Sequence, residues 1–252
     1  MKFDEFDKQM RIYEQSLDQV VLPDIYIAAR LDGRSFTRLT KEICQFEAPF
    51  DIRFRDLMTD TACHLMDCGF RIVYAYTESD EISLLFHPGE HAFGRKTRKL
   101  NTTLAGEASA VFSLALGKAA TFDCRIIPLP DKERVRDYFV WRQEDAHRNS
   151  LNSYCYWTLR KEGLAKQQAT AMLEGKTVSY KNELLFQRGI NYNNLPCWQK
   201  RGTGIYYKDI VIEGYNPVTN KNTETMRRKL YIDYELKTCK EYGEWAEHFL
   251  EL

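Results

Sequence analysis

Two aspartates in the first third of the chain are of the type and setting that phosphate chemistry uses. Asp32 ends the apolar run "IYIAARL" and is followed by Gly33, while Asp80 lies in the polar stretch "TESD" between "RIVYAY" and "EISLLF". Carboxylate oxygens and a turn carbonyl are hard ligands that magnesium prefers, and glycine lets backbone N–H groups approach a triphosphate. If the fold brings Asp32 and Asp80 together, the expected chemistry is two-metal phosphoryl or nucleotidyl transfer.

The elements that must position these aspartates follow an ordered alternation. Apolar runs predict strands at 25–32, 71–76, 81–86 and 121–129, and helical spacing of apolar residues predicts helices at 52–68 and 97–116. The order βαββαβ is that of the ferredoxin-like fold, an α+β arrangement whose strands usually lie in the order 4-1-3-2. Strand 1 then lies beside strand 3, so the sequence predicts that Asp32 and Asp80 meet at one edge of the sheet.

The second half of the chain has a different pattern. It begins with a long segment of helical period, rich in aromatic and basic residues, and the runs "IYYKDIVIE" and "RRKLYIDYEL" predict a β-ribbon at the end of the fold. We therefore expect a catalytic core over residues 1–130 and a helical and β-ribbon extension over residues 131–252, packed on the core as one continuous unit. Aromatic residues interleaved with Arg and Lys suit RNA bases and phosphates, although core packing is the default for most of them.

The composition restricts the class of protein. The 252 residues carry 36 basic and 36 acidic side chains, so no overall field identifies a nucleic-acid binder. No apolar stretch reaches about 18 residues, and the N-terminus lacks the apolar region of a signal peptide, which predicts a soluble, cytoplasmic protein without membrane partners. The seven cysteines include no C-x-x-C pair and suit reduced thiols better than disulfides or a structural zinc site.

Structural explanations compete with the metal-site hypothesis when the residues are taken alone. Asp32 and Gly33 also suit an ordinary turn, and the acidic stretch around Asp80 also suits a solvated loop. Ferredoxin-like folds serve many non-catalytic roles. His87 and His91 stand four residues apart, but the Pro-Gly between them favours a loop over a metal pair on a helix. Neither a P-loop nor a G-x-S-x-G motif occurs.

Six collinear segments resemble the tRNA-His guanylyltransferase superfamily of 3′-to-5′ RNA polymerases. They are "RLDGRSF", "YTESDEISLLF", the segment around Lys99 before a small-residue helix, "WRQEDAHRNSLNSYCYW", "KNELLF" and "INYNNLPCWQKRGTG", which together span most of residues 3–207. The resemblance implies a polymerase-type palm, two Mg²⁺ ions, and ATP and GTP as substrates. It further implies addition of nucleotides to the 5′ end of tRNA, activated by adenylylation or as a triphosphate, and a homotetramer.

The resemblance also implies roles for the residues at matching positions. Asp32, Asp80 and Glu81 would be the catalytic carboxylates, and Asp32, Asp80 and the Gly33 carbonyl would hold the metal ions. The nucleotide would contact Asp32, Gly33, Arg34, Ser35, Phe36, Thr37, Ser79, Arg98, Lys99, Lys181, Asn182 and Asn191. The tRNA would contact His147, Asn149, Lys200 and Arg201. No side-chain base is required, because the metals lower the pKa of the attacking 3′-hydroxyl.

Two departures from the family pattern bear on the substrate. Eukaryotic members carry H-I-N-N-L-Y-N where this chain has His147-Arg-Asn-Ser-Leu-Asn-Ser153. The family's F-x-K-P-x-D loop is Phe46-Glu-Ala-Pro-Phe-Asp51, without its phosphate-binding lysine, for which Lys41 is a candidate substitute. These features resemble the bacterial and archaeal guanylyltransferase-like proteins.

We therefore expect template-dependent 3′-to-5′ repair of 5′-truncated tRNAs, with guanylate addition to tRNA-His as the alternative. A nucleotidyl cyclase shares a palm with paired aspartates, but the second half of the chain argues against it. A non-catalytic RNA-binding module on the same fold is the other alternative. Such modules carry the aromatic run K/R-G-F/Y-G/A-F-V-x-F/Y, which this sequence lacks.

Overall fold

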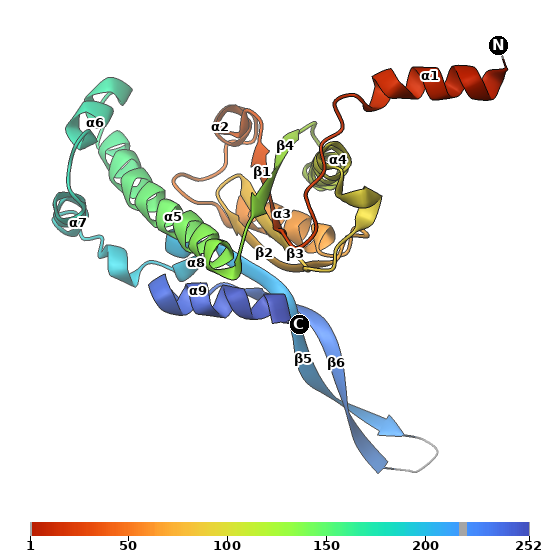
Figure 1. Cartoon of the computed structure of the whole chain (residues 1–252). Helices are drawn as coiled ribbons and strands as arrows, with labels where there is room; N and C mark the ends of the chain where they lie inside the picture. Colours follow the sequence, from red (N-terminus) through yellow and green to blue (C-terminus); the bar gives the residue numbers. More distant parts are fainter. Residues whose placement is uncertain (1, 217–220, 252) are drawn as a thin grey trace.

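The computed structural model of the chain describes residues 2–216 and 221–251 (Figure 1). Its helices are α1 (Phe3–Gln15), α2 (Phe36–Arg38), α3 (Ile52–Leu65), α4 (Thr97–Leu116), α5 (Lys132–Lys161), α6 (Lys166–Leu173), α7 (Val178–Phe186), α8 (Cys197–Arg201) and α9 (Cys239–His248). Its strands are β1 (Tyr26–Gly33), β2 (Ile72–Glu78), β3 (Glu81–Phe86), β4 (Phe122–Leu129), β5 (Thr203–Asn216) and β6 (Lys221–Asp233). Short π- or 3₁₀-helical turns lie at Leu39–Ile43, Ala92–Arg95, Tyr192–Asn194 and Phe249–Glu251.

The sheet confirms the predicted ferredoxin-like order. Its six strands lie in the order β4-β1-β3-β2-β5-β6, so the first four keep the expected 4-1-3-2 arrangement. Neighbouring strands are antiparallel, and Asp32 near the end of β1 stands directly opposite Glu81 at the start of β3. The predicted ribbon continues the same sheet, because β5 pairs with β2 and β6 pairs with β5. One sheet therefore contains strands from both halves of the chain.

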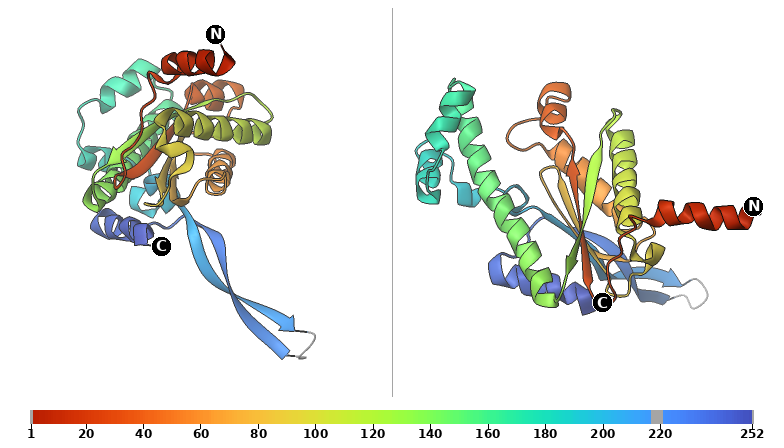
Figure 2. Two further views of the ribbon diagram at one scale, coloured as in Figure 1. Left: turned by 45° about the vertical axis from the view of Figure 1, so that its right-hand side comes forward. Right: turned by 45° about the horizontal axis from the view of Figure 1, so that its top comes forward.

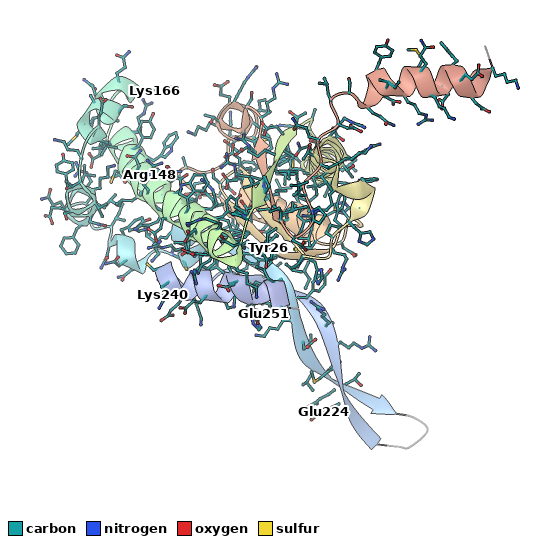
Figure 3. The ribbon with its side chains drawn as sticks, viewed as in Figure 1. Tyr26, Arg148, Lys166, Glu224, Lys240 and Glu251 are labelled. Carbon is teal, nitrogen blue, oxygen red and sulfur yellow. The ribbon has the colours of Figure 1, made fainter. Side chains whose placement is uncertain are left out.

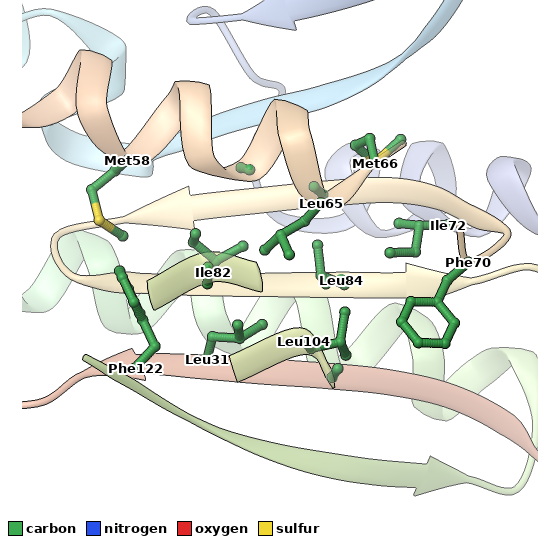
Figure 4. Close-up of a cluster of buried hydrophobic side chains, with 14 of the residues drawn as sticks. Leu31, Met58, Leu65, Met66, Phe70, Ile72, Ile82, Leu84, Leu104 and Phe122 are labelled. Atoms are coloured by element: carbon green, nitrogen blue, oxygen red, sulfur yellow. The ribbon is translucent and has the colours of Figure 1, made fainter. Parts of the chain in front are cut away.

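Helices α3 and α4 cover one face of this sheet (Figure 2). The buried layer between them and the strands includes Leu31, Met58, Leu65, Ile82, Leu84, Leu104 and Phe122 (Figure 4). In α4 the buried residues Leu100, Leu104, Ala108 and Phe112 recur every four residues, which puts one stripe of the helix on the core. The helix ends at Gly117 with a φ of 70°, a left-handed conformation that glycine adopts without strain. This layer fixes the strand ends that carry the aspartates.

Helices α5 and α9 cover the opposite face, and α9 corrects one expectation. The sequence predicts the ribbon as the last element, but after β6 the chain returns to the sheet as α9, which packs on α5 (Figure 1). Tyr242 of α9 is fully buried, and its hydroxyl lies 2.9 Å from that of Tyr74 of β2. This helix has only ten residues, so its buried positions Tyr242, Gly243 and Ala246 supply a single repeat of the helical pattern.

The far half of α5 belongs to a separate helical layer beside the sheet. Helices α6 and α7 pack against it around a small core that includes Leu151, Cys155, Leu159, Ala169, Leu173, Leu184, Leu185 and Tyr192. Arg148 of α5 and Lys166 of α6 mark this part of the molecule in Figure 3. The helical layer therefore extends the molecule beyond the end of the strands that carries Asp32 and Asp80.

Two elements project from this body. Helix α1, which the sequence did not predict, contains no buried residue and extends away from the sheet (Figures 1 and 2). The distal ribbon, which is the part of β5 and β6 beyond residues 210 and 227, projects in another direction (Figures 1 and 2). Their exposed apolar residues include Phe3, Phe6, Met10, Ile12, Tyr13, Val211 and Met226. Among the described residues no helix combines the length and apolar character needed to cross a membrane.

Candidate functional site

The end of β1 and the turn between β2 and β3 lie against each other at one end of the strands. The Gly33 N–H donates a hydrogen bond of 2.9 Å to the Asp80 carbonyl oxygen. The two aspartate side chains are also electrostatic neighbours, because the pKa of Asp80 is raised mainly by burial and further by the negative charge of Asp32. The structure thus brings Asp32 and Asp80 together, as the strand order predicts.

The backbone around the aspartates is tightly turned. Ser35 and Ser79 have positive φ angles of 61° and 49°, a conformation that residues other than glycine adopt rarely and often at functional turns. The Ser79 hydroxyl donates to Asp80 Oδ1 at 3.2 Å. At Gly33 a Cβ atom would lie 2.5 Å from the ring of Phe36, which is buried. Glycine is therefore required here for close packing rather than for an unusual φ.

Two N–H groups that follow Asp32 form hydrogen bonds within the chain. The Gly33 N–H is bonded to Asp80, and the Arg34 N–H donates to the Thr121 carbonyl oxygen at 2.8 Å. Both groups join the strand ends, and a contact between the N–H groups of the Gly-Arg-Ser stretch and a triphosphate stays a prediction. The exposed Arg34 side chain and the Ser35 hydroxyl remain at the surface beside the aspartates.

Two guanidinium groups flank Asp32 on the face of the sheet that α5 covers. Arg125 of β4 donates to Asp32 Oδ2 at 3.2 Å, and the Nε atom of Arg30 lies 3.4 Å from the same oxygen. Within the described residues that Nε atom is buried and has no hydrogen-bond partner. The sequence analysis missed both arginines, although alternate residues of a strand face one side of a sheet and Arg30 therefore shares a face with Asp32. Positive charge at this position suits phosphate groups.

Glu81 stands beside the two aspartates, but its oxygens are engaged elsewhere. Arg142 of α5 donates from Nε to Glu81 Oε1 at 2.7 Å and from Nη2 to Oε2 at 2.9 Å. Burial raises the pKa of Glu81, and the charge of Arg142 opposes that effect. The neighbouring Glu78 has its pKa raised to about 8 by burial and by the charge of Glu81, so it is largely protonated at neutral pH. Asp32 and Asp80 are therefore the carboxylates available to a ligand at this end of the strands.

A cavity of about 190 Å³ opens beside Asp80, between the sheet, the loop at 46–51 and α5. Its lining includes four of the residues predicted to bind nucleotide or metal: Phe36, Thr37, Ser79 and Asp80. Aromatic rings outside the predicted set complete the walls: Phe46, Phe50, Phe54, Trp157 and Trp198. Because cavities for whole drug-sized ligands are roughly 300 to 1,000 Å³, this one suits a flat group of nucleobase size.

Lys41 also lines the aromatic cavity. Its amino group lies 4.8 Å above the ring of Trp157, and its pKa is lowered by burial and by the charge of Lys166. Ala48, at the position of the family lysine, lines the same cavity. A cationic side chain is therefore present at the cavity although the family lysine is missing.

The residues predicted to contact tRNA gather where α5 meets α8 and the turn at Tyr192. The Nδ1 atom of His147 lies 3.3 Å from the Tyr192 hydroxyl, and burial together with the charge of Arg201 lowers the pKa of His147. Lys200 and Arg201 lie on α8, and Asn149 lies one turn beyond Asp145 on α5. These four predicted residues therefore occupy one region of the molecule.

Three residues predicted to contact nucleotide belong to the same helical layer. Lys181 and Asn182 lie on α7, where the Lys181 carbonyl oxygen accepts from the Cys155 thiol of α5, and Asn191 caps the turn at Tyr192. The structure groups them with His147 rather than with the aspartates.

Arg98 and Lys99 lie at the other end of β1 from Asp32. Helix α4 starts where the chain enters β1 and finishes beside the last residues of that strand. Its 20 residues correspond to about 30 Å of helix. Arg98 Nε is bonded to Asp18 at 3.0 Å, and the Lys99 amino group lies 5.8 Å above the ring of Phe93. Within one chain the structure does not bring these two residues to the carboxylates.

The groups that would hold metal ions are Asp32, Asp80 and the Gly33 carbonyl. In residues 2–216 and 221–251, no three His, Cys, Asp or Glu side chains are grouped so that they could hold a metal ion by themselves. Two carboxylates nevertheless suit magnesium, which is usually bound through one or two carboxylates together with substrate phosphates and water. A cation would also offset the burial and the charge of Asp32, which together raise the pKa of Asp80. The donor set therefore fits magnesium better than zinc.

Comparison with known proteins agrees with the resemblance found in the sequence. The family described as tRNAHis guanylyltransferase matches residues 7–130, and the Thg1 C terminal domain family matches residues 133–241. A probable tRNA(His) guanylyltransferase of Drosophila melanogaster is 37% identical over 213 residues, which are 81% of this chain and 73% of that protein.

Two solved structures share the fold. The tRNA(His) guanylyltransferase of Saccharomyces cerevisiae superposes with a TM-score of 0.71 at 30% identity, covering 77% of this chain and 91% of that one. A bacterial tRNA(His) guanylyltransferase (Thg1)-like protein in complex with GTP superposes with a TM-score of 0.73 at 26% identity, covering 98% of this chain and 100% of that one. The chain belongs to the tRNA(His) guanylyltransferase family and is, like its relatives, a nucleotidyltransferase.

Proposed function

We propose that this protein adds guanylate to the 5′ end of tRNA(His) by 3′-to-5′ nucleotidyl transfer. The observation that carries the proposal is the meeting of Asp32 with Asp80, which lines the aromatic cavity, in a chain of this family. The names of the relatives support guanylate and tRNA(His) better than the repair activity that the sequence analysis favoured. The GTP bound to the similar bacterial protein supports GTP as a substrate.

In the proposed reaction the 3′-hydroxyl oxygen of GTP attacks the 5′ phosphorus of a tRNA that ATP has adenylylated. The new bond joins GTP to the tRNA, the bond to AMP breaks, and the hydroxyl proton passes to solvent. Two magnesium ions bound by Asp32, Asp80 and the Gly33 carbonyl would lower the pKa of that hydroxyl and neutralise the leaving group. Arg30 and Arg125 would neutralise phosphate charge next to Asp32.

The aromatic cavity would receive the base of a nucleotide whose phosphates lie near Ser79 and Asp80. Stacking of a base on aromatic rings is worth roughly 1–3 kcal/mol and tolerates any base. The rings of Phe46 and Trp157 would therefore orient the nucleotide without discriminating between bases. Lys41 would supply to the phosphates the positive charge that the family lysine supplies elsewhere. His147, Asn149, Lys200 and Arg201 would contact the tRNA, and Lys181, Asn182 and Asn191 would meet it or the activating nucleotide.

Template-dependent repair of 5′-truncated tRNAs is the second candidate, and one observation favours it. The stretch from His147 to Ser153 keeps only His147, Asn149 and Leu151 of the motif found in eukaryotic members, and Asn149 is exposed beside the predicted tRNA contacts. If that change has removed the selection of tRNA(His), pairing of the incoming nucleotide with the opposite strand would determine which nucleotide is added. Such pairing is worth roughly 1–3 kcal/mol, or about 5-fold to 150-fold.

One substrate panel separates the two candidates. Full-length tRNA(His) without its extra guanylate, and 5′-truncated tRNAs of other identities with each of the four bases opposite the gap, are incubated with ATP, GTP, CTP, UTP and magnesium. The proposal expects guanylate on tRNA(His) regardless of the opposing base and little addition elsewhere. Added nucleotides that follow the opposing base in every tRNA would instead establish repair, and a chain that extends none of them would overturn both candidates.

The assembly and location of the protein are also proposals. We retain the homotetramer, because α1 and the distal ribbon carry exposed apolar residues away from the body, where other copies would cover them. A cytoplasmic location is consistent with seven cysteines that are all unpaired. Light scattering of the purified protein gives the oligomeric state directly.

A further inference from the structure

A buried ion pair joins the second half of the chain to the carboxylates at the end of the strands. Arg142 projects from α5 toward the sheet, and its side chain is 6% exposed. Its guanidinium holds both oxygens of Glu81, its Nη2 atom donates to Asp145 Oδ2 at 3.0 Å, and Glu78 Oε1 lies 3.8 Å away. Forked contacts of this kind fix both the position and the orientation of a carboxylate.

Without Arg142, the Glu81 side chain could contact other charged groups near the end of β1. Glu81 directly follows Asp80 and stands opposite Asp32, and its Oε2 atom lies 3.7 Å from the Nε atom of Arg30. The Nε atom of Arg30 also lies 3.4 Å from Asp32 Oδ2, so the Glu81 and Asp32 side chains flank the same guanidinium group. A buried carboxylate that loses its partner is strongly destabilised until it finds another cation. Arg30 would remain beside Glu81 at 3.7 Å, and a divalent ion held by Asp32 and Asp80 would be a second, more highly charged cation.

We infer that Arg142 is a positioning residue: it holds Glu81 back from the cation position, so that Asp32 and Asp80 alone present carboxylates there. The inference rests on the proposed function and names a device for that same site. A third carboxylate would bind a divalent ion more tightly and replace a water or phosphate oxygen that the reaction needs. Arg142 therefore determines how many protein carboxylates contact the cation. Lysine cannot replace it fully, because an ammonium group lacks the planar fork that occupies both oxygens.

The structure also explains how Arg142 is itself held. Asp145, one turn further along α5, accepts from Arg142 and from the exposed residues Arg148 and Asn149. The pair is thus anchored on a helix that continues into the region proposed to contact tRNA. A second forked ion pair lies away from the sheet, where Arg188, just after α7, contacts Glu162 at the C-terminal end of α5 at 2.6 and 3.0 Å. Arg188 provides the control.

The experiment compares wild type, Arg142→Met, Arg142→Lys, the double variant Arg142→Met with Glu81→Gln, and Arg188→Met. Binding of Mn²⁺ to the protein without nucleotide is measured by electron paramagnetic resonance. The magnesium dependence and kcat of nucleotide addition are measured in parallel, and thermal unfolding identifies variants that do not fold.

We expect Arg142→Met to bind Mn²⁺ at least about 5-fold more tightly, because Glu81 joins the ion, and to lose at least about 10-fold in kcat. Arg142→Lys should shift Mn²⁺ affinity about 2-fold in the same direction, since one oxygen of Glu81 is freed. Glu81→Gln added to Arg142→Met should return the affinity to within about 2-fold of wild type, because the amide has no charge to offer. Arg188→Met should leave both quantities unchanged.

A folded Arg142→Met protein with unchanged Mn²⁺ affinity would overturn the inference, and so would a double variant that still binds the ion more tightly. If Arg142→Met does not fold, an unchanged Mn²⁺ affinity of Arg142→Lys would also overturn the inference. A wild-type protein that extends no tRNA would contradict the proposed function instead, while the Mn²⁺ comparison would still decide the role of Arg142.

Discussion

Gly33 is tightly packed beside the aspartates. A Cβ atom there would lie 2.5 Å from the Phe36 ring, which is held in place by the rings of Phe54, Phe112 and Phe122. Gly33→Ala should therefore displace Phe36 and the turn that carries Asp32. We expect a loss of about 1–3 kcal/mol in the free energy of unfolding, measured with urea, and a large loss of nucleotide addition.

The matched control is Gly106→Ala in α4, where nothing lies within 4 Å of the added atom. A helical position of this kind gains stability by about 0.5–1 kcal/mol when glycine becomes alanine. Equal destabilisation at residues 33 and 106 would show that the contact with Phe36 is not the cause.

Asp51 gives the fold a defined dependence on acid. Its carboxylate accepts from the Arg53 guanidinium and from the N–H groups of Arg53 and Glu47, and chiefly the bond with Arg53 lowers the pKa of Asp51 to about 2. Because the folded pKa is below the ordinary value of about 3.8, this group stabilises the protein above about pH 4, and its contribution is lost as the pH falls toward 2.

Asp51→Asn should lower the free energy of unfolding by about 1 kcal/mol at pH 7, because asparagine can still cap the N-terminus of α3 but has no negative charge to bond the Arg53 guanidinium. Urea unfolding at several pH values between 7 and 2 gives the difference between wild type and variant. The difference should shrink below about pH 4, and one that stays constant down to pH 2 would contradict the assigned role of the ionised carboxylate.

At the scale of elements, local patterns and the strand order that they indicate could be predicted, whereas contacts between side chains of distant elements could not. The four palm strands and α4 have apolar periods that match their burial, so their positions follow from the sequence within a few residues. The aromatic cavity combines the loop at 46–51 with Trp157 of α5 and Trp198 of α8, which only the fold brings together. The role of Arg142 likewise depends on its contact with Glu81, between α5 and β3. The spacing of residues along the sequence does not indicate such a contact.

The aromatic cavity supports a prediction at this scale. Trp157→Leu removes one wall of the cavity, so we expect the KM for the activating nucleotide to rise about 5-fold to 150-fold, with a smaller change in kcat. Steady-state kinetics with varied ATP measures both constants. Phe186→Leu is the control, because Phe186 of α7 is exposed and lies outside the cavity. A Trp157→Leu protein with the wild-type KM for ATP would show that the cavity does not bind the nucleotide.

At the scale of the whole molecule, one sheet and one long helix join the two halves of the chain. β5 extends the palm sheet beyond β2, the Tyr76 hydroxyl donates to the Arg201 carbonyl oxygen at 2.9 Å, and Arg142 connects α5 to β3. The division at residue 130 into core and extension remains a proposal, because these contacts cross it. The site itself depends on both halves: its carboxylates come from the first, while Arg142, Trp157 and Trp198 come from the second.

The sequence motifs and the relatives point to different substrates. The altered stretch from His147 to Ser153 favoured repair, whereas the relatives favour guanylate addition to tRNA(His). The physical reason is that specificity is a difference between two binding free energies of a large RNA. A few changed side chains on one helix do not determine the sign of that difference.

The central claim is that Asp32 and Asp80 act together in transferring a nucleotide to the 5′ end of tRNA. The most direct measurement is the 5′ sequence of tRNA(His) without its extra guanylate after incubation with ATP, GTP, magnesium and wild type, Asp32→Asn, Asp80→Asn or Asp137→Asn. Asp137 is exposed on α5 and serves as the matched control. If Asp32 and Asp80 hold the metal ions as proposed, loss of either carboxylate removes several kcal/mol of transition-state stabilisation, so we expect at least about a 1,000-fold loss in both site variants, with no loss of stability. Wild-type and Asp137→Asn proteins should add the guanylate, and an Asp80→Asn protein that extends the tRNA at more than a few per cent of the wild-type rate would contradict the account.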